Sequence, residues 1–547
     1  MACSWSERAW PLFYRIDWHI KHETEVAYRD GTLAATRLDD FVYVWIGVRA
    51  IPVAVIVGVC LRTRLVVLIG KDAMVDKQAL VNRLRDAGQE HLMQFWDELS
   101  VAGQAELATQ LDKIDFDLVS QLVAGHDDAP NWSELAAKAK PPRAIRLDSA
   151  ENEFSADEAC ERGEEALRTG QLGLILVAGG QGTRLNFDHP KGMFKLGPVS
   201  NRTLFQILIE RLRAIARRYD VRISMYLMTS HATDAETHEF LNRNDRFGLA
   251  EADLKVFCQG TMPAVDAQTG RLLLADPGSL AVSPDGHGGT LAAFRSSGCM
   301  ADTVDREIEH LFYCQIDNPL AQICDPTLIG YHLLADSDMT TQVVKKREAT
   351  ERVGNVVDLD GRTQIIEYSD LPDQYGKRTN ADGSLLLWAG NLAIHIFRRQ
   401  FLQEAAGQAE VLPFHRALKK VPHIDQAGNA IEPASANAIK FERFIFDLLP
   451  VAKNAIVIES RASEAFAPVK NANGAASDTP QHTQAAMIQY DRSVLAGAGA
   501  EVGPGVAVEV SPLYALDSDE ARAKIQPAQR INEPTYFAAP EAATVPE

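Results

Sequence analysis

The chain has 547 residues, too many for one typical hydrophobic core, so we expect two or three domains. Its formal net charge of −19 argues against a nucleic-acid-binding protein that works by general attraction to phosphate, so any phosphate site must be a local cluster of cations. The seven cysteines, an odd number without a C-x-x-C pair, indicate reduced thiols in a cytosolic protein rather than a disulfide framework.

Residues 1–73 differ in composition from the rest of the chain. They contain four of the seven tryptophans and an apolar run, Ala50–Leu61, that Pro52 interrupts. The run has 12 residues, fewer than the roughly 20 that span a bilayer, and it lies too far along for a signal peptide. We expect Met74 to be the true start and residues 1–73 to be an atypical extension, translated in frame from upstream sequence. A membrane-associated or regulatory extension is the alternative.

The region 74–168 is predicted to be helical. Apolar side chains recur at helical spacing and predict one helix from Leu80 to Leu99 and a second that includes Leu107, Leu111 and Ile114. Pro141-Pro142 marks a linker, and a charged helix, Ser155–Leu167, leads into the next region.

The region 169–457 alternates strands with helices. Strands are predicted at Leu172–Ala178, Ile223–Thr229, Leu311–Ile316, Thr340–Lys345, Thr363–Tyr368 and Leu385–Ile396. Helices are predicted at Thr203–Ile215, which is amphipathic, and at Asp234–Asn242. This alternation predicts an α/β fold with an open, twisted, mostly parallel sheet covered by helices, whose ligand binds at the carboxyl ends of the strands.

The composition changes again near Ile458. The chain becomes rich in Ala, Gly and Pro, with short apolar segments between them. We expect a small, partly β domain at 458–531 and a disordered tail at 532–547.

The segment Leu174–Leu185 indicates a phosphate-binding loop. An apolar, β-rich run ends in a cluster of glycines, which Arg184 and then Lys191 follow. The glycines let backbone N–H groups approach phosphate oxygens, and the two cations offer a planar fork and a point charge for the same anion. An ordinary turn between a strand and a helix would not require both cations.

Two commoner glycine loops do not fit this segment. A dinucleotide fingerprint requires a third glycine where this chain has Leu185, and no acidic residue follows at the end of a clear second strand. A P-loop requires a hydroxyl residue after its lysine, whereas Gly192 and Met193 follow Lys191. A nicotinamide dehydrogenase is therefore disfavoured.

Polar residues accompany other predicted strands. Asp317 ends a strand and suits a hard divalent cation, although it equally suits the N-cap of a following helix. The glycine-rich loop Pro284–Thr290 can bring backbone groups close to a base or sugar or can be a surface turn, and His287 within it can be structural. Glu367 and Asn391 lie at or beyond strands, where they can bind sugar hydroxyls or occupy turn or edge positions.

Taken together, these residues resemble the UDP-sugar pyrophosphorylase family, and most closely its eukaryotic-type UDP-N-acetylhexosamine branch. The resemblance covers roughly residues 74–500 and rests on motifs that recur in order: Leu176–Leu185, Pro190–Met193, Thr203–Gln206, Met228–Ser230, Ile316–Asn318, Glu367–Ser369, Ala389–Asn391 and Phe441–Asp447. It implies a Rossmann-like nucleotide-diphospho-sugar transferase domain between an N-terminal helical part and a small C-terminal domain, in agreement with the organisation above.

The resemblance also implies roles for individual residues. The glycine loop would contact uridine and the UTP phosphates at Val177, Ala178, Gly179, Gly180 and Gly182. The uracil would contact Gln259 and Gly286, and the sugar would be surrounded by His287, Glu367, Gly390 and Asn391. Lys440 would reach the nucleotide phosphates and Lys470 the sugar phosphate. Without the resemblance, both lysines would be interpreted as solvent-exposed side chains without a function.

The reaction that the resemblance implies is attack by a sugar 1-phosphate oxygen on the α-phosphorus of UTP, which expels pyrophosphate without a general base. Asp317 would hold Mg²⁺ or Mn²⁺, which with Lys191 and Lys470 would offset the repulsion between the two anions. Arg184 would take the charge that grows on pyrophosphate. We therefore expect a cytoplasmic enzyme whose partners are UTP and a sugar 1-phosphate, and neither nucleic acid nor a membrane.

The motifs leave the sugar open. The N-acetylhexosamine branch usually has asparagine where this chain has His287, and glucose-type enzymes have histidine there. Conversely, animal-type glucose enzymes lack the arginine that is present here as Arg184. N-acetylglucosamine 1-phosphate is the expected acceptor. A UDP-glucose or broad-specificity UDP-sugar pyrophosphorylase and a non-catalytic UDP-sugar sensor are the alternatives.

Overall fold

The structure is a computed structural model that describes residues 76–125, 131–147, 149–408 and 411–539. Upstream of these it describes the backbone of one antiparallel sheet, formed by β1 (Ala35–Leu38), β2 (Phe41–Ile46), β3 (Val55–Cys60) and β4 (Leu65–Ile69). The predicted start at Met74 lies outside the described residues. Across the described residues, no helix combines the length and the apolar character required to cross a bilayer.

The N-terminal part is helical, as predicted, and consists of α1 (Lys77–Asp86), α2 (Val101–Asp112), α3 (Phe116–Ala124) and α4 (Trp132–Lys138). The prediction of one helix from Leu80 to Leu99 is wrong. Gly88 adopts a φ of +68° and terminates α1, because glycine enters this left-handed conformation without strain. The chain continues as two short 3₁₀ helices, η1 (Glu90–Met93) and η2 (Trp96–Glu98).

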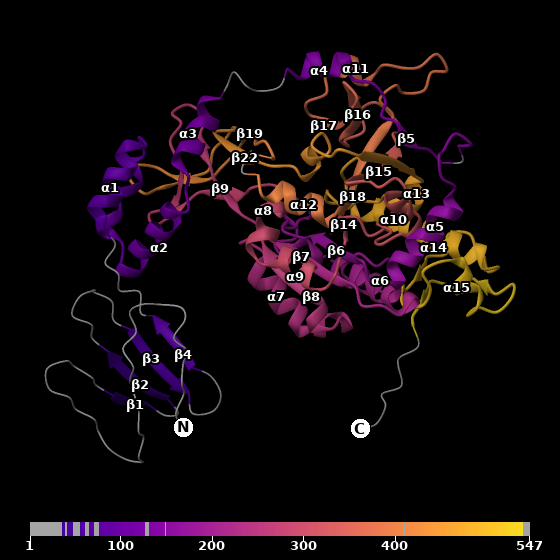
Figure 1. Cartoon of the computed structure of the whole chain (residues 1–547), viewed down its shortest axis with the longest axis horizontal. Helices are drawn as coiled ribbons and strands as arrows, with labels where there is room; N and C mark the ends of the chain where they lie inside the picture. The colour runs from indigo at the N-terminus through magenta and orange to yellow at the C-terminus, as the bar shows by residue number, and fades with distance from the viewer. Residues whose placement is uncertain are drawn as a thin grey trace.

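Helices α1, α2 and α3 pack against a small sheet in the order β10 (Val265–Asp266), β22 (Ala438–Glu442) and β19 (His415–Lys419). Leu84, Leu107 and Phe441 are fully buried in their shared core. In Figure 1 the first helices accordingly lie beside β19 and β22, at one side of the central sheet.

The central sheet is mostly parallel, as predicted. Its main path runs β5 (Ala144–Ile145), β23 (Ala455–Ser460), β15 (Met339–Lys345), β18 (Ala389–Arg398), β14 (His310–Gln315), β6 (Leu172–Val177), β7 (Ser224–Thr229) and β8 (Leu254–Cys258). Only β18 is antiparallel to its neighbours along this path. The hairpin β16 (Asn355–Leu359) and β17 (Arg362–Ile366) joins through β18, so the predicted strand Thr363–Tyr368 lies off the main path.

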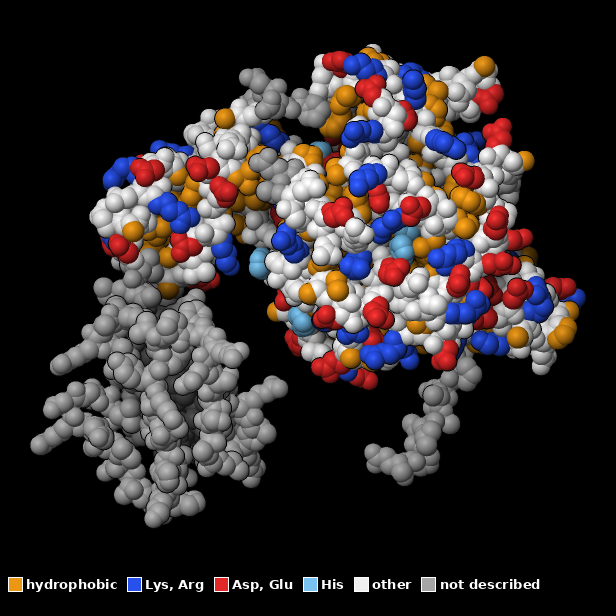
Figure 2. Space-filling view, viewed as in Figure 1, with side chains coloured by type: hydrophobic (Ala, Val, Ile, Leu, Met, Phe, Trp, Pro, Cys, Tyr) orange, Lys and Arg blue, Asp and Glu red, His pale blue; other side chains and the backbone are white. Residues whose placement is uncertain are grey.

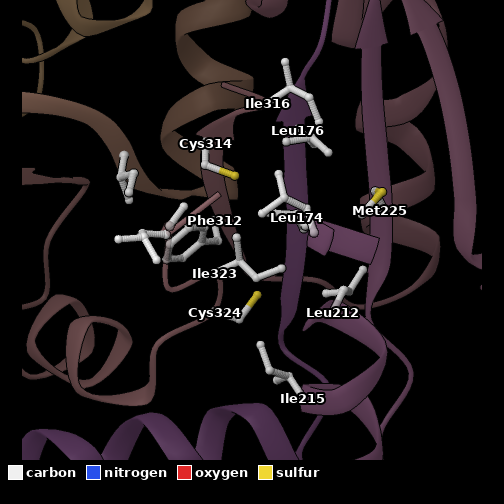
Figure 3. Close-up of a cluster of buried hydrophobic side chains, with 14 of the residues drawn as sticks. Leu174, Leu176, Leu212, Ile215, Met225, Phe312, Cys314, Ile316, Ile323 and Cys324 are labelled. Atoms are coloured by element: carbon white, nitrogen blue, oxygen red, sulfur yellow. The ribbon is translucent and has the colours of Figure 1, made fainter. Parts of the chain in front are cut away.

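Strand β6 is apolar along its whole length because both faces of the sheet are covered. Leu174 and Leu176 of β6 pack on one face with Phe312 of β14 (Figure 3), whereas Ile175 packs on the opposite face with Tyr313. The first face is covered by α5 (Ala156–Arg168), α6 (Leu204–Tyr219), α10 (Pro326–Leu334) and α14 (Pro480–Gly497). The second face is covered by α8 (Gly289–Ser296), α9 (Cys299–Asp305) and α12 (Arg399–Ala406).

Shorter elements connect these layers. The helical ones are η3 (Thr183–Leu185), η4 (Lys191–Met193), α7 (Asp234–Arg243), η5 (Asp245–Gly248), η6 (Glu251–Asp253), α11 (Asp373–Gly376), η7 (Ile445–Leu448) and α13 (Ala462–Ala465). The short strands are β9 (Thr261–Pro263), β11 (Leu274–Asp276), β12 (Ser279–Leu280), β13 (Val282–Pro284), β20 (His423–Ile424) and β21 (Ala430–Ile431). On the face shown in Figure 2, basic and acidic side chains are intermixed.

The C-terminal part, from the end of α14 onward, has a hydrophobic core of its own. It contains α15 (Ser518–Arg522) and the strand pairs β24 (Glu501–Val502) with β26 (Arg530–Ile531) and β25 (Val508–Val510) with β27 (Thr535–Phe537). The prediction of a disordered tail is wrong for residues 532–539, because β27 pairs with β25 and buries Phe537; residues 540–547 lie outside the described part. The predicted domain boundary between residues 457 and 458 also fails, because it falls inside β23.

Candidate active site

The predicted glycine loop follows β6 and is held by hydrogen bonds on both sides. The Ala178 N–H donates to a carbonyl of β7 at 2.8 Å, and the Lys191 N–H donates to the Gly180 carbonyl at 3.0 Å. The Ser230 hydroxyl donates to the Gly179 carbonyl at 2.7 Å. The loop is therefore fixed between the end of β7 and η4, directly after Val177 ends β6.

Packing requires glycine at one position of the loop, leaves little room at a second, and places a third beside open space. A Cβ on Gly182 would lie 2.7 Å from the Phe187 carbonyl oxygen, and a Cβ on Gly179 would lie 3.0 Å from Oε1 of Gln259. At Gly180, by contrast, the described residues place no heavy atom within 4 Å of the Cβ position. A ligand can therefore approach the backbone at Gly180, with the buried Gln259 side chain next to the same loop.

Lys191 and Asp317 are brought together at the carboxyl edge of the sheet. Lys191 comes after β6 in the chain and Asp317 comes after β14, and these two strands are adjacent and parallel. The Lys191 ammonium lies 3.9 Å from Oδ2 of Asp317, with the two side chains 18% and 14% exposed. The pair is thus largely enclosed but reachable, as a site for phosphate and a cation requires.

The segment that contains Lys470 crosses this edge. The Val469 N–H donates to the Asp317 carbonyl and the Ala472 N–H donates to the Arg184 carbonyl, both at 2.8 Å. Lys470 therefore lies between two residues that are tied to the predicted phosphate site. The Arg184 side chain is exposed, and within the described part of the chain it makes no hydrogen bond or ion pair.

The alternative that Asp317 caps a following helix is wrong. The next helix, α10, begins nine residues later at Pro326, and its N-cap is Asp325, whose carboxylate accepts from the Leu328 N–H at 2.8 Å. Over the residues that the structure describes, no group of three or more His, Cys, Asp or Glu side chains could hold a metal ion. A single carboxylate fits Mg²⁺ that is shared with substrate phosphates and retains several waters.

The second glycine-rich loop is bonded to the segment at the end of β22. Gly286 adopts a φ of +83°, and a Cβ there would lie 2.4 Å from the Arg443 carbonyl oxygen. Arg443 donates its N–H to the Asp285 carbonyl and accepts from the Gly288 N–H, both at 2.8 Å. This close approach explains why the loop requires glycine at 286.

His287 faces aromatic neighbours on the same segment. Its ring stacks on Phe444, with centroids 5.3 Å apart and an interplanar angle of 24°. The Ile445 N–H donates to Nδ1 of His287 at 3.2 Å, so the ring proton of the neutral imidazole resides on Nε2. Burial, together with the charge of His415, lowers the pKa of His287 to about 4. His287 is therefore neutral at physiological pH and can donate one hydrogen bond from Nε2.

Glu367, Gly390 and Asn391 meet around Gly354. A Cβ on Gly354 would lie 2.9 Å from Oε1 of Glu367 and 3.6 Å from Cβ of Asn391. The Asn391 N–H donates to the Gly354 carbonyl at 2.8 Å, and Gly390 pairs with Asn355 on β16. Burial, followed by the charge of Asp370, raises the pKa of Glu367 to about 7.

Lys440 is the predicted residue with the weakest link to the others. It lies on β22, opposite Ala417 of β19, in the small sheet rather than the central one. Glu442, two residues further on the same face of the strand, has its Cβ 3.1 Å from the Cβ position of Gly286. Among the described residues, the Lys440 ammonium makes no hydrogen bond or ion pair.

The sequence analysis missed a charged pair and a buried carboxylate beside these residues. His415 donates from Nε2 to Oδ2 of Asp447 at 2.7 Å, and its ring lies 4.4 Å from that of Phe444. Asp285 is buried next to Arg443. Asp447 ends the motif Phe441–Asp447, so the motif was a usable signal, whereas nothing in the sequence around His415 distinguishes it from a structural histidine.

Comparisons of sequence identify known proteins to which this chain is similar. The sequence model of a family described as UTP–glucose-1-phosphate uridylyltransferase matches residues 132–496. The UDP-N-acetylglucosamine pyrophosphorylase of Saccharomyces cerevisiae is 35% identical over 448 residues, which cover 78% of this chain and 92% of that protein. UDP-N-acetylhexosamine pyrophosphorylase-like protein 1 of Homo sapiens is 34% identical over 444 residues, which cover 78% of this chain and 87% of that protein.

A solved structure supports the fold independently. The UDP-N-acetylglucosamine pyrophosphorylase of Trypanosoma brucei, crystallised with an inhibitor, superimposes with a TM-score of 0.69. The match covers 84% of this chain and 99% of that chain at 24% identity, so it concerns the fold alone. The predicted α/β architecture with an N-terminal helical part is therefore confirmed.

Proposed function

Because the chain belongs to the UTP–glucose-1-phosphate uridylyltransferase family, we propose that it transfers the uridylyl group of UTP to N-acetylglucosamine 1-phosphate and releases pyrophosphate. The choice of sugar is supported by relatives with 32–35% identity that are named as UDP-N-acetylglucosamine or UDP-N-acetylhexosamine pyrophosphorylases. The observation that carries the proposal is the pair formed by Lys191 and Asp317, 3.9 Å apart, beside a glycine loop that opens at Gly180.

The chemistry requires two anions to meet in line. Two unit charges 4 Å apart repel by about 4 kcal/mol at an effective dielectric constant near 20. The attacking phosphate oxygen is already ionised at neutral pH, so the protein has to position the reactants rather than remove a proton. Backbone N–H groups of the glycine loop and the Lys191 ammonium would bind the UTP phosphates.

Other cations would act on the remaining phosphates. Lys470 lies on the segment bonded to Asp317 and Arg184, where it would hold the sugar phosphate. The Arg184 side chain is exposed and has no hydrogen-bond or ion-pair partner among the described residues, so its guanidinium is available for the charge that develops on pyrophosphate. Asp317 would hold Mg²⁺, which when bound supplies positive charge to the phosphate oxygens.

We further propose a cytoplasmic location. The cysteines that the structure describes, Cys160, Cys258, Cys299, Cys314 and Cys324, are all free thiols. This agrees with a reducing compartment. Fractionation of the native cells would test the proposal, and recovery of the protein from an oxidising compartment would contradict it.

The function is tested by a substrate comparison. The protein is incubated with UTP and Mg²⁺ and, separately, with the 1-phosphates of N-acetylglucosamine, N-acetylgalactosamine and glucose, while pyrophosphate release is measured. We expect the highest kcat/KM with N-acetylglucosamine 1-phosphate. A preference for glucose 1-phosphate would overturn the choice of sugar. Tight binding of a UDP-sugar with no pyrophosphate release would indicate a sensor instead.

A further inference from the structure

Lys346 is a buried lysine in contact with one of the predicted sugar-binding residues. It comes directly after β15 and is only 4% exposed. Its backbone N–H donates at 2.8 Å to the carbonyl of Trp388, the residue before β18 begins. A Cβ on Gly390 would lie 3.2 Å from Cγ of Lys346. The aliphatic part of this lysine therefore packs against the backbone of β18 at Gly390.

The ammonium group of Lys346 is bonded to the neighbouring hairpin. It donates to Oδ1 of Asn355 at 2.5 Å, and Asn355 is itself only 1% exposed. The Asn355 amide donates in turn to the Ile366 carbonyl at 3.3 Å and to the Val353 carbonyl at 3.4 Å. Ile366 directly precedes Glu367 in the chain, so hydrogen bonds connect Lys346 to the backbone next to Glu367.

Lys346 and Asn355 lie on the opposite side of the hairpin from the predicted sugar site. The Cβ position of Gly354 is 2.9 Å from Oε1 of Glu367 and 3.6 Å from Cβ of Asn391, so residue 354 faces the predicted site. Successive residues of a strand face opposite sides, and Asn355 therefore faces away from that site, toward Lys346. The pair supports the predicted sugar-binding residues from behind.

The hairpin is attached to β18 over a short stretch. Strand β16 pairs with β18 at one position, where Asn355 lies opposite Gly390. The Asn391 N–H donates to the Gly354 carbonyl at 2.8 Å at the same place. Lys346 adds a second connection, because its backbone is bonded to the sheet and its side chain to the hairpin. The separation of Glu367 on the hairpin from Asn391 on the sheet therefore depends on Lys346.

We propose that Lys346, acting through Asn355, is a positioning residue that sets the distance between Glu367 and Asn391 for binding of the sugar. The inference rests on the proposed function, since these two residues face a sugar only if the acceptor is a sugar 1-phosphate. Sugar hydroxyls require donors and acceptors at fixed positions, so a small shift of the hairpin weakens their binding. The nucleotide site, which lies on other loops, is not affected by such a shift.

The burial of this lysine has a cost that packing alone does not explain. Burial lowers the pKa of Lys346, as expected for an ammonium group that is removed from water. An apolar side chain of similar length would fill the same space without this cost. The hydrogen bond to Asn355 is what the apolar side chain would lose.

The test uses two variants to separate positioning from stability. Lys346→Met leaves the Asn355 amide oxygen without its donor, so it should lower Tm. It should also raise KM for the sugar 1-phosphate about 10- to 100-fold, because a misplacement of 1 Å costs about 100-fold and a smaller one less, while KM for UTP stays unchanged. Adding Asn355→Leu makes both partners apolar, which is often nearly neutral for stability. Tm should then return toward the wild-type value, whereas KM for the sugar 1-phosphate should stay raised.

Thr340→Val is the matched control. Thr340 lies near the start of β15, at the end of the strand away from Lys346, and is fully buried. Its hydroxyl forms a hydrogen bond of 2.7 Å with Nδ1 of His332. The variant also loses one buried hydrogen bond and should lower Tm, but it should change neither KM.

Calorimetric titration with UDP and with UDP-N-acetylglucosamine distinguishes failure of this inference from failure of the proposed function. Lys346→Met should weaken binding of the UDP-sugar and leave binding of UDP unchanged. Equal effects on the two ligands would overturn the inference, as would a KM that recovers together with Tm in the double variant. A wild type that binds the UDP-sugar but releases no pyrophosphate would instead refute the proposed function, and the two affinities would still decide the role of Lys346.

Discussion

Gly286→Ala is predicted to disable the site through a sub-ångström displacement of the backbone. Gly286 has a φ of +83°, and a Cβ there would lie 2.4 Å from the Arg443 carbonyl oxygen. Gly383 has the same φ of +83° but, among the described residues, no heavy atom within 4 Å of its Cβ position. Gly383→Ala is therefore a matched control that carries the conformational penalty without the collision.

The two penalties can be separated. The left-handed conformation costs an alanine roughly 1–2 kcal/mol at either position. At Gly286 the Arg443 carbonyl must also move by at least about 0.6 Å, from 2.4 Å to the 3.0 Å minimum for a real Cβ contact. Overpacking of this kind adds about 1–3 kcal/mol. We expect this movement of the Arg443 carbonyl also to stretch the 3.2 Å hydrogen bond from the Ile445 N–H to His287, which orients the histidine ring.

Thermal unfolding and steady-state kinetics test this reasoning together. Gly383→Ala should lower Tm by a few degrees, about 2–4 °C per kcal/mol for a domain of this size, and leave kcat/KM unchanged. Gly286→Ala should lower Tm further and reduce kcat/KM by about 100-fold, the effect typical of a 1 Å misplacement of a binding group. Equal activity in the two variants would refute the idea that the loop must dock on residues 443–445.

The remaining predictions concern charge. Arg184→Ala should lower kcat by about 100-fold or more with little change in KM, because one preorganised donor contributes roughly 3 kcal/mol in the transition state; a change confined to KM would show that Arg184 serves binding only. Asp317→Asn should weaken activation by Mg²⁺ in a metal titration, and unchanged activation would exclude it as the metal ligand. KM for the sugar 1-phosphate should fall as the pH rises through about 7, because the raised pKa of Glu367 keeps this carboxyl protonated below that pH; Glu367→Gln should flatten the profile.

The sheet and the glycine loop were predictable because their signals are local in the sequence. The strand from Leu172 is a continuous apolar run that ends in glycines, and a strand buried on both faces has this composition. The place of Asp317 beside Lys191 also followed, since adjacent parallel strands end at one edge of the sheet. Local patterns were sufficient for these elements.

Features that depend on contacts between residues far apart in the sequence could not be predicted. Leu80 and Leu99 keep helical spacing across Gly88, and only the tertiary structure shows that the chain turns there. Residues 532–539 have a mixed composition with a proline, which does not itself indicate a strand, yet β27 is ordered by pairing with β25. His415 and Asp447 are 32 residues apart, and only the close approach of β19 to η7 makes them a pair.

Under the proposed function, the segment that follows β23 is part of the catalytic machinery rather than an appendage. The segment with Lys470 begins only after β23, the last strand to join the central sheet, and it is fixed at both ends by hydrogen bonds to Asp317 and Arg184. Helix α14 then follows at once, and its Thr483 hydroxyl donates to the Pro468 carbonyl at 3.0 Å. Because the end of the same helix belongs to the C-terminal core, we expect a change in that core to affect the position of Lys470. The cation proposed for the sugar phosphate is thus held from both sides, by the central sheet and by the unit that follows it.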